Sequence, residues 1–262
     1  MKLKNILVAV ATFGIAAPAV AQDIRATSFE GSFRQYNDSD VDGSVAALGA
    51  GIEIGLASAF SIGANLSVVD SDETDASIMT TTVHGMYALS DATALGVFAA
   101  VESGESIDAS NYGVEFGTGT NGTRLEAYFG VVDSDDLDDR DRSIAGLSFE
   151  FQVARGFSVG FDYESISQSD VPVTTSDGSF LEDVTFGDTA LFVRYSFENG
   201  PSVFAEVGQI ASSFSTADTR FISEEEIEYV AIGASYSIGR STGTIFGNRS
   251  FLDFGGLLNL DG

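Results

Sequence analysis

The first candidate for chemistry is a short acidic stretch near the start of the chain, in which carboxylates alternate with other residues. Asp38, Asp40 and Asp42 stand two positions apart, and Gly43 follows at once. This is the first half of a calcium-binding loop, where alternate carboxylates surround a hard cation and glycine allows the sharp turn. The twelfth position of such a loop should be a glutamate, and here it is Gly49. We therefore expect either a calcium site at the three aspartates or a plain acidic loop.

Other site chemistry is limited by the scarcity of histidine and cysteine. His84 is the single histidine, and there is no cysteine, so neither a disulfide framework nor a thiolate site is available. No phosphate-binding glycine loop or zinc constellation appears in the sequence. The dense acidic stretch 133–141 (DSDDLDDRD) has no register of ligands. It indicates a solvated surface, with loose bridging of divalent ions or lipopolysaccharide as the alternative.

The charge of the chain excludes nucleic acid as a partner. Twelve Lys and Arg residues stand against 39 Asp and Glu residues, which gives a formal net charge of −27 at pH 7. Phosphate backbones are bound by clustered Lys and Arg side chains, and this composition does not provide them.

The first 21 residues predict export. They combine two early lysines, a short apolar run and the small-x-small pattern at 19–21, and we expect a signal peptide cleaved after Ala21. A membrane anchor is the alternative, but the apolar run is short and is interrupted by Gly14 and Pro18. No later segment reaches the roughly 20 unbroken apolar residues that a membrane helix needs. A mature chain that spans a membrane must therefore do so as a closed β-barrel.

Alternation with a period of two is the strongest pattern in the sequence, and it predicts β-strands. In residues 143–165 (SIAGLSFEFQVARGFSVGFDYES) two alternating runs are separated by a short turn at 153–156. Such a hairpin has apolar rows on one face and small, polar and acidic residues on the other. The pattern recurs and predicts twelve strands, at 25–36, 44–55, 60–69, 77–89, 94–101, 111–117, 123–132, 143–152, 157–166, 186–197, 202–211 and 227–238.

The connections between these strands alternate in length. Those around 56–59, 90–93, 118–122, 153–156 and 198–201 are short, and those around 37–43, 70–76, 102–110, 133–142, 167–185 and 212–226 are longer and more acidic. Strands of about 9–11 residues with alternating short turns and long loops are typical of outer-membrane barrels. We therefore predict an all-β fold, a transmembrane antiparallel up-and-down β-barrel of about 12 strands over residues 22–238. The long loops should face outward, and both chain ends should be periplasmic.

The spacing across the short turns predicts the strand register. Most turns separate the neighbouring apolar rows by six residues, as from Ile54 to Phe60, and we expect an even step to keep both rows on one face. The step from Phe116 to Leu125 is nine. This odd step predicts a bulge near the glycine-rich turn 118–123 (TGTNGT).

The opposite row of each strand should face the lumen, and it supplies the candidate functional residues. No charge interrupts the apolar row, as expected for residues that face lipid. The lumen row holds nine acids and three arginines, so some carboxylates must meet water. These candidate pore-lining residues are Glu30, Arg34, Glu53, Glu115, Arg124, Glu126, Glu150, Asp162, Glu164, Asp188, Arg194 and Glu206.

A C-terminal tail, residues 239–262, follows the last predicted strand. Residues 233–238 (GASYSI) resemble the closing-strand signal of outer-membrane barrels, a glycine followed by alternating aromatic or apolar positions. We expect the tail to lie in the periplasm. The alternatives are a further hairpin, which would give fourteen strands, and a segment folded into the lumen.

Taken together, these features resemble the Gram-negative outer-membrane porin-like barrels, over nearly all of residues 22–238. The resemblance implies passive diffusion of small hydrophilic solutes through a water-filled lumen in the cell outer membrane, surrounded by lipid and lipopolysaccharide. It implies no cofactor, so that calcium at the surface loops is the one candidate ion. Twelve strands are fewer than the roughly 16 of general porins. Because lumen carboxylates attract cations, we predict a cation-preferring channel of unspecified oligomeric state.

Three alternatives to an open channel remain. One is a barrel whose lumen is filled by its own Glu and Arg side chains, and another is a structural or adhesive barrel that acts through its acidic surface loops. The third is an outer-membrane hydrolase. Phospholipases of this kind also have twelve strands, but their nucleophilic serine needs a histidine on the lipid-facing side, whereas the phase of His84, with Thr80 and Thr82, points it into the lumen. Omptin-like protease chemistry has no identified partner for this histidine, so we predict that the protein is not an enzyme.

Overall fold

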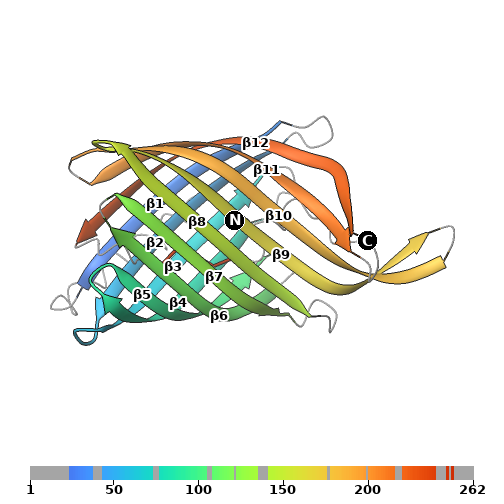
Figure 1. Ribbon diagram of the computed structural model, residues 1–262, viewed down its shortest axis with the longest axis horizontal. Helices are drawn as coiled ribbons and strands as arrows, with labels where there is room; N and C mark the ends of the chain where they lie inside the picture. Colours follow the sequence, from blue (N-terminus) through green and yellow to red (C-terminus); the bar gives the residue numbers. More distant parts are fainter. Residues whose placement is uncertain are drawn as a thin grey trace.

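The protein forms a closed antiparallel barrel of twelve strands (Figure 1). The computed structural model describes residues 24–37, 43–72, 77–104, 108–120, 122–134, 141–175, 178–198, 200–215, 220–239, 246–247 and 249–250. The strands are β1 (Ile24–Tyr36), β2 (Ser44–Gly55), β3 (Phe60–Ser71), β4 (Ser77–Ser90), β5 (Thr93–Ser103), β6 (Asp108–Thr120), β7 (Thr123–Asp133), β8 (Arg142–Ala154), β9 (Phe157–Thr175), β10 (Gly178–Ser196), β11 (Pro201–Ser215) and β12 (Arg220–Gly239). Within these ranges there is no helix long and apolar enough to cross a membrane.

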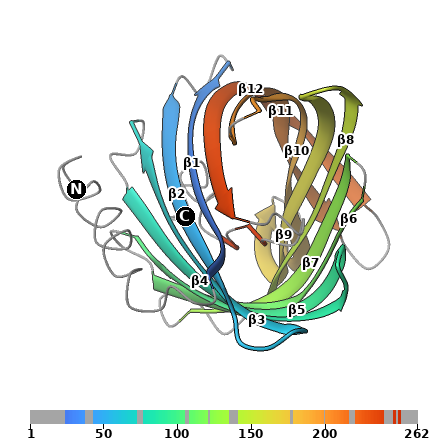
Figure 2. The ribbon, with the colours of Figure 1, turned by 90° about the vertical axis from the view of Figure 1, so that its left-hand side faces the viewer.

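The first and last strands close the wall. Every other pairing joins neighbours in sequence, and β1 pairs with β12 from Ala26 opposite Gly239 to Tyr36 opposite Tyr229. Figure 2 shows the wall from the end where the short turns lie. Closure removes the free edges of the sheet, whose unpaired backbone groups lipid cannot satisfy. The predicted twelve-stranded up-and-down barrel is confirmed, and the fourteen-stranded alternative is wrong because β12 already pairs with β1.

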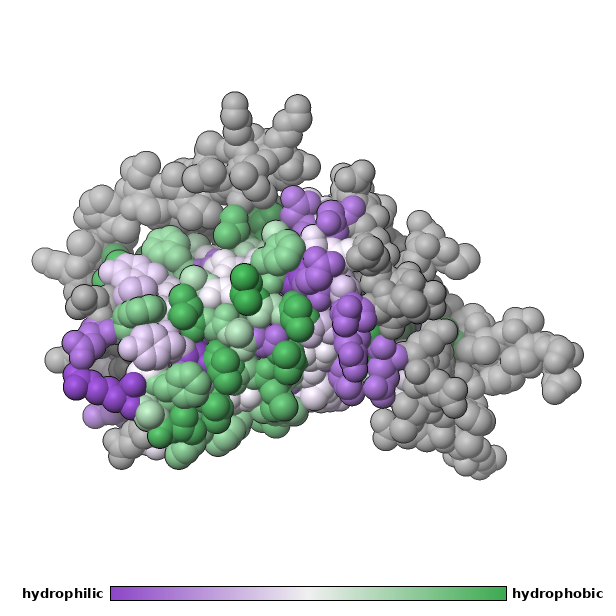
Figure 3. Space-filling view, turned by 90° about the horizontal axis from the view of Figure 1, so that it is seen from above, coloured by the Kyte–Doolittle hydropathy of each residue, from purple (hydrophilic) through white to green (hydrophobic). Residues whose placement is uncertain are grey.

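The outer face of the barrel is apolar. On β5, Leu95, Val97 and Val101 are 46–64 % exposed, whereas Phe98 and Glu102 on the inner row are at most 3 % exposed. This alternation follows from the pleat, which directs successive side chains to opposite faces. Figure 3 shows apolar side chains in a band across the wall, with hydrophilic residues beyond the band. Such a band is the surface that a membrane barrel presents to lipid.

Aromatic side chains lie at the end of this band near the short turns. Phe60 lies beside Tyr87, and Tyr195 lies beside Phe197, each pair with ring centroids 4.9 Å apart. All four side chains are exposed on the outer face. Aromatic rings at this height are typical of the boundary between lipid and water.

The register of the β6–β7 hairpin corrects the bulge prediction. Thr118 lies opposite Leu125, and the ladder continues without a shift to Thr120 opposite Thr123. A two-residue turn places residues of odd separation opposite one another, so the odd step is the regular one here. Gly122 in this turn has a φ of +86°, which residues with a side chain rarely adopt. Register shifts occur instead at the short turns of β4–β5 and β8–β9, where the step is even.

The strands β9 to β12 extend further than the alternation predicts. Residues 167–185 and 212–226 were expected as long loops, but β9 and β10 pair as far as Thr175 opposite Gly178. Similarly, β11 and β12 pair as far as Ser215 opposite Arg220. The β9–β10 hairpin projects beyond the rest of the barrel (Figure 1). The apolar alternation stops there because a ribbon that leaves the membrane has no lipid-facing side, so periodicity no longer marks it.

Candidate functional site

Part of the C-terminal tail lies inside the barrel. Phe246 is 2 % exposed, and its ring stacks on His84 with centroids 6.0 Å apart. The side-chain nitrogen of Asn65 donates a hydrogen bond of 2.8 Å to the carbonyl oxygen of Phe246. Arg249 and Ser250 are each 3 % exposed. For these described residues the structure differs from the expected periplasmic tail, and the reason is that polar groups of the lumen wall bind them.

Arg249 is held by two carboxylates and an aromatic ring. Its Nη2 and Nε lie 3.1 and 3.3 Å from Oε2 of Glu115, and Nη2 also donates to Oε1 of Glu126. The guanidinium carbon lies 4.2 Å from the ring centroid of Tyr128. Charge-assisted hydrogen bonds and a π face are the contacts that best suit a guanidinium group. We call Glu115, Glu126 and the ring of Tyr128 the Arg249 site.

The tail has a second polar contact deeper in the barrel. The hydroxyl of Ser250 donates a 2.6 Å hydrogen bond to Oε2 of Glu102, and Asn111 donates a 2.6 Å hydrogen bond to Oε1 of the same carboxylate. Glu102 is fully buried. Sequence analysis missed this residue because the predicted strand ended at residue 101, although one more step of the alternation places it in the lumen row.

His84 lies in the lumen, as its phase predicts. Its Nδ1 is 2.8 Å from Oε1 of Glu115, and its Nε2 is 2.9 Å from the side-chain nitrogen of Asn65. These polar partners and the stacked ring of Phe246 hold the imidazole against the wall. Through Asn65, which also binds the carbonyl oxygen of Phe246, and through the stacked ring itself, His84 has a part in seating the tail.

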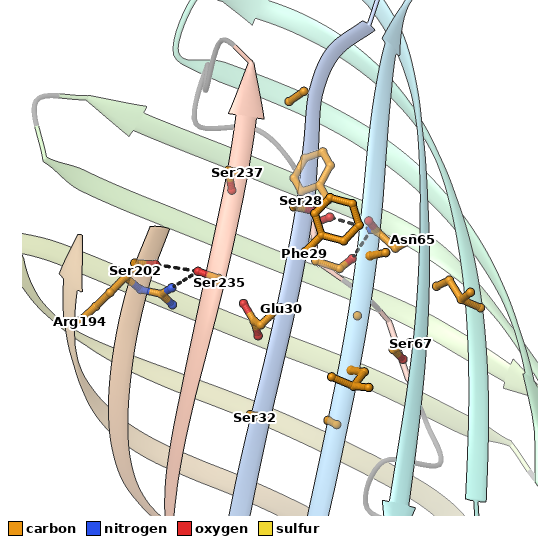
Figure 4. A pocket seen from close by; sticks show the side chains of 18 of the residues that line it. Ser28, Phe29, Glu30, Ser32, Asn65, Ser67, Arg194, Ser202, Ser235 and Ser237 are labelled. Atoms are coloured by element: carbon orange, nitrogen blue, oxygen red, sulfur yellow. Dashed lines mark hydrogen bonds between the residues drawn. The ribbon is translucent and has the colours of Figure 1, made fainter. Parts of the chain in front are cut away.

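The wall opposite the tail borders a cavity of about 620 Å³ (Figure 4). The tail itself forms part of its lining through Phe246 and Gly247. Three arginines and two glutamates contribute charge, and six serines labelled in Figure 4 contribute hydroxyl groups. These residues are Arg34, Arg124, Arg194, Glu30, Glu150, Ser28, Ser32, Ser67, Ser202, Ser235 and Ser237.

Each arginine of the cavity has a carboxylate partner. Nε of Arg194 lies 3.5 Å from Glu150, and Nη2 of Arg124 lies 3.0 Å from Glu126. Nη1 of Arg194 also donates a hydrogen bond of 3.2 Å to the hydroxyl of Ser235. Arginine charge in the cavity is therefore balanced locally.

Arg34 has the most partners. It lies 3.2 Å from Asp188 and 3.7 Å from Glu206, and its guanidinium carbon is 3.9 Å from the ring centroid of Tyr229. Glu30, on the same strand, points into the cavity and has no cationic partner among the described residues. Of the five charged lining residues, Glu30 is thus the one outside an ion pair with another described residue.

The structure also places the other predicted lumen residues. Glu53 lies 3.8 Å from Arg25, and Glu164 accepts a hydrogen bond from the hydroxyl of Tyr128. Asp162 lies opposite Ser148 in the ladder, on the inner row. The charged lumen residues that the sequence analysis missed are Arg25, Glu102, Arg142 and Arg249. Including them, the described lumen row and tail hold ten acids and six arginines.

An apolar ring lies on the inner wall toward the long connections. Its members Tyr36, Ile78 and Ala109 are within two residues of a strand end, and Ile144 is fully buried. The ring consists of Tyr36, Ile78, Phe98, Ala109, Val132, Ile144, Ile166, Ala190, Ile210, Tyr229 and Ala231. Arg34 of the cavity lining lies over Tyr229 of this ring, with its guanidinium carbon 3.9 Å from the ring centroid.

Three sequence predictions lie outside the described residues. They are the calcium half-loop Asp38, Asp40 and Asp42, most of the acidic stretch 133–141, and the signal peptide 1–21. In the part of the chain that the structure describes, no group of three or more His, Cys, Asp or Glu side chains is arranged to hold a metal ion.

Comparison with known proteins shows similarity of fold to solved outer-membrane barrels. No family model and no curated protein matches the chain. Among solved structures, the NanC porin matches with a TM-score of 0.55 and 9 % identity, over 80 % of this chain and 98 % of that one. An outer membrane channel (COG4313) from Pseudomonas putida F1 matches with a TM-score of 0.55 and 10 % identity, over 84 % and 98 %. The KdgM porin, also solved in complex with disordered oligogalacturonate, matches with a TM-score of 0.52 and 12 % identity, over 80 % and 99 %.

These similarities concern the fold alone. They show that the chain shares the closed antiparallel barrel fold of these outer-membrane proteins, and the apolar band agrees with a wall that faces lipid.

Proposed function

We propose that the protein is an outer-membrane channel for small hydrophilic solutes and that it prefers cations. The observation that supports this most directly is the cavity of about 620 Å³ inside the barrel, whose lining is rich in hydroxyl groups. A serine hydroxyl both donates and accepts hydrogen bonds, so it can replace the hydration water of a polar solute. An enzyme is not proposed, because the lumen groups described have the geometry of ion pairs and a seated tail.

The charge balance supports the cation preference. The ten acids of the described lumen exceed the six arginines, and each cavity arginine is paired with a carboxylate. Glu30 faces the cavity without a cationic partner among the described residues. A surplus of carboxylates raises the local concentration of cations and repels anions. The oligogalacturonate bound by KdgM carries many carboxylates, so the same charge argues against a comparable solute here.

Ion conduction by the full chain tests this proposal. The mature protein is refolded, inserted into a planar lipid bilayer and placed in a gradient of potassium chloride. We expect small discrete conductance steps with a cation-selective reversal potential, because described tail residues and the apolar ring occupy part of the lumen. Glu30→Gln should lower the ratio of cation to anion permeability, and Glu198→Gln, at an exposed turn, should leave it unchanged. An anion-selective current, or a flat baseline from protein shown to be inserted, would refute the proposal.

A second candidate function is interaction at the cell surface. The observation that favours it is the β9–β10 hairpin, which stays paired to Thr175 and Gly178 and projects beyond the barrel (Figure 1). Deletion of residues 171–182 should then abolish adhesion to cells or matrix and preserve conductance. If the deletion variant keeps both adhesion and conductance, this candidate is refuted.

A further inference from the structure

We propose that the lumen wall carries a binding site for small solutes with a guanidinium group, and that Arg249 occupies this site as a built-in competitor. The site is the Arg249 site defined above. Its binding chemistry does not depend on transport, but a role for it in solute passage rests on the proposed function as a channel.

The wall alone supplies the groups that hold the guanidinium. Glu115 on β6 lies directly opposite Tyr128 on β7 in the ladder, and Glu126 is two residues away on β7, on the same face. Neighbouring paired strands fix these three side chains relative to one another. Residues on rigid elements hold a binding geometry better than residues on loops.

Hydrogen bonds within the wall orient both carboxylates. Oε1 of Glu115 is engaged by Nδ1 of His84 at 2.8 Å, which leaves Oε2 for Arg249. Oε2 of Glu126 is engaged by Nη2 of Arg124 at 3.0 Å, which leaves Oε1 for Arg249. One oxygen of each carboxylate is therefore anchored to the wall, and the other points at the guanidinium.

The aromatic side of the site is fixed as well. The Tyr128 hydroxyl donates a hydrogen bond to Glu164, and the ring edge lies against Gly146, where an added Cβ would collide with it. Edge-to-face contact with Phe98, at a centroid distance of 6.1 Å, holds the ring from another side. The π face that receives the cation thus keeps its orientation without help from the tail.

The backbone of Arg249 is also held by the wall. Asn111 is 1 % exposed, and its side-chain nitrogen donates to Glu102 and to the carbonyl oxygen of Arg249. Its Oδ1 is buried and has no hydrogen-bond partner among the described residues.

Chemical rescue of an Arg249→Ala variant tests the proposal. The full chain carrying this substitution is refolded in detergent, and its thermal unfolding midpoint is followed by circular dichroism during titration with methylguanidinium chloride. Methylammonium chloride at the same concentrations is the matched control, because it carries the same charge without the planar fork. We expect the midpoint to rise with the logarithm of the methylguanidinium concentration above its dissociation constant, by about 3–6 °C at ten times that constant.

Three comparisons make the outcome decisive. Methylammonium should not raise the unfolding midpoint of Arg249→Ala. Methylguanidinium should not raise the midpoint of the wild-type chain, because Arg249 fills the site. It should not raise the midpoint of Arg249→Ala/Glu126→Gln either, because one carboxylate is lost. An equal response to both cations, or no rise with methylguanidinium, overturns the proposal. If Arg249→Ala does not refold, Arg249→Gln keeps most of the side-chain volume and is titrated in its place.

Conductance separates this proposal from the proposed function. Saturable binding with no conductance would leave the guanidinium site standing and refute the channel. Conductance without saturable binding would leave the channel standing and refute the guanidinium site.

Discussion

The ion pair between Arg249 and Glu115 gives the sharpest prediction, because it ties the tail to the barrel. Arg249 approaches Oε2 of Glu115 through two nitrogens at 3.1 and 3.3 Å. The side chain of Glu115 is fully buried and that of Arg249 is 4 % exposed, so water screens the pair little. Removing one member of a buried pair leaves the other charge uncompensated and typically costs about 3–5 kcal/mol.

A double-mutant cycle isolates this interaction. Arg249→Ala, Glu115→Gln and the double variant are unfolded in urea from lipid vesicles, and the free energies of unfolding are compared with the wild type. We expect each single substitution to destabilise the barrel by about 3 kcal/mol. The double substitution should cost much less than the sum, which gives a coupling energy of about 2–3 kcal/mol.

An exposed pair is the matched control. Arg155 and Glu198 lie 2.6 Å apart at the short turns, closer than Arg249 and Glu115, but their side chains are 88 % and 78 % exposed. Their coupling energy should be only about 0.2–1 kcal/mol. Burial, not distance, therefore decides the predicted order. A coupling for the buried pair no larger than that of the exposed pair would refute the placement of the tail in the lumen.

Three further predictions test the outer face, the tail and a loop. Phe129→Lys places a charge on a lipid-facing position that is 54 % exposed, and it should lower the free energy of unfolding in lipid by about 2–4 kcal/mol. Gly117→Val should displace Phe246 and raise the single-channel conductance, because an added Cβ would lie 2.9 Å from the ring. Hydrogen bonds from the backbone and hydroxyl of Ser44 lower the pKa of Asp72. A lowered pKa gives stability that is present above about pH 4 and is lost as the pH falls through the folded-state pKa. Ser44→Ala should therefore raise the pKa of Asp72 in a carboxyl NMR titration.

The first two of these predictions have a control variant within the chain. Ser67→Lys places the same charge in the cavity and should cost far less than Phe129→Lys, since Ser67 is on the lining. Gly85→Val should leave conductance unchanged, because its added Cβ would be in ordinary contact with Val97 at 3.5 Å. An unchanged pKa of Asp72 in Ser44→Ala would contradict the hydrogen-bond argument.

Strand existence and face could be predicted from the sequence because lipid and lumen impose opposite chemistry on alternate residues. The apolar row at Leu95 and Val97 and the inward phase of His84 follow from this alternation alone. Where a strand leaves the lipid, the alternation of apolar and polar residues ends. The paired ribbon near Thr175 was therefore expected as a loop.

A tail segment folded into the lumen was one of the alternatives, but its contacts could not be predicted, for a different physical reason. Phe246 and Arg249 belong to a segment with no period, and their burial depends on partners more than 120 residues earlier in the chain. The lumen phase does predict that Glu115 and Glu126 face inward. It does not show which cation lies between them, because that contact depends on three-dimensional proximity and not on spacing.

The pairing of β1 with β12 also sets an order of events in folding. Eleven of the twelve pairings join sequential strands and form between segments close in the chain. The last pairing must bring residue 26 to residue 239, so it carries the largest loop-closure entropy and must wait for the final strand. The tail follows β12 directly in the chain. We therefore expect the tail to bind the inner wall at the stage at which β12 pairs with β1. A chain that stops at Gly239 would still close its wall, but with the Arg249 site empty.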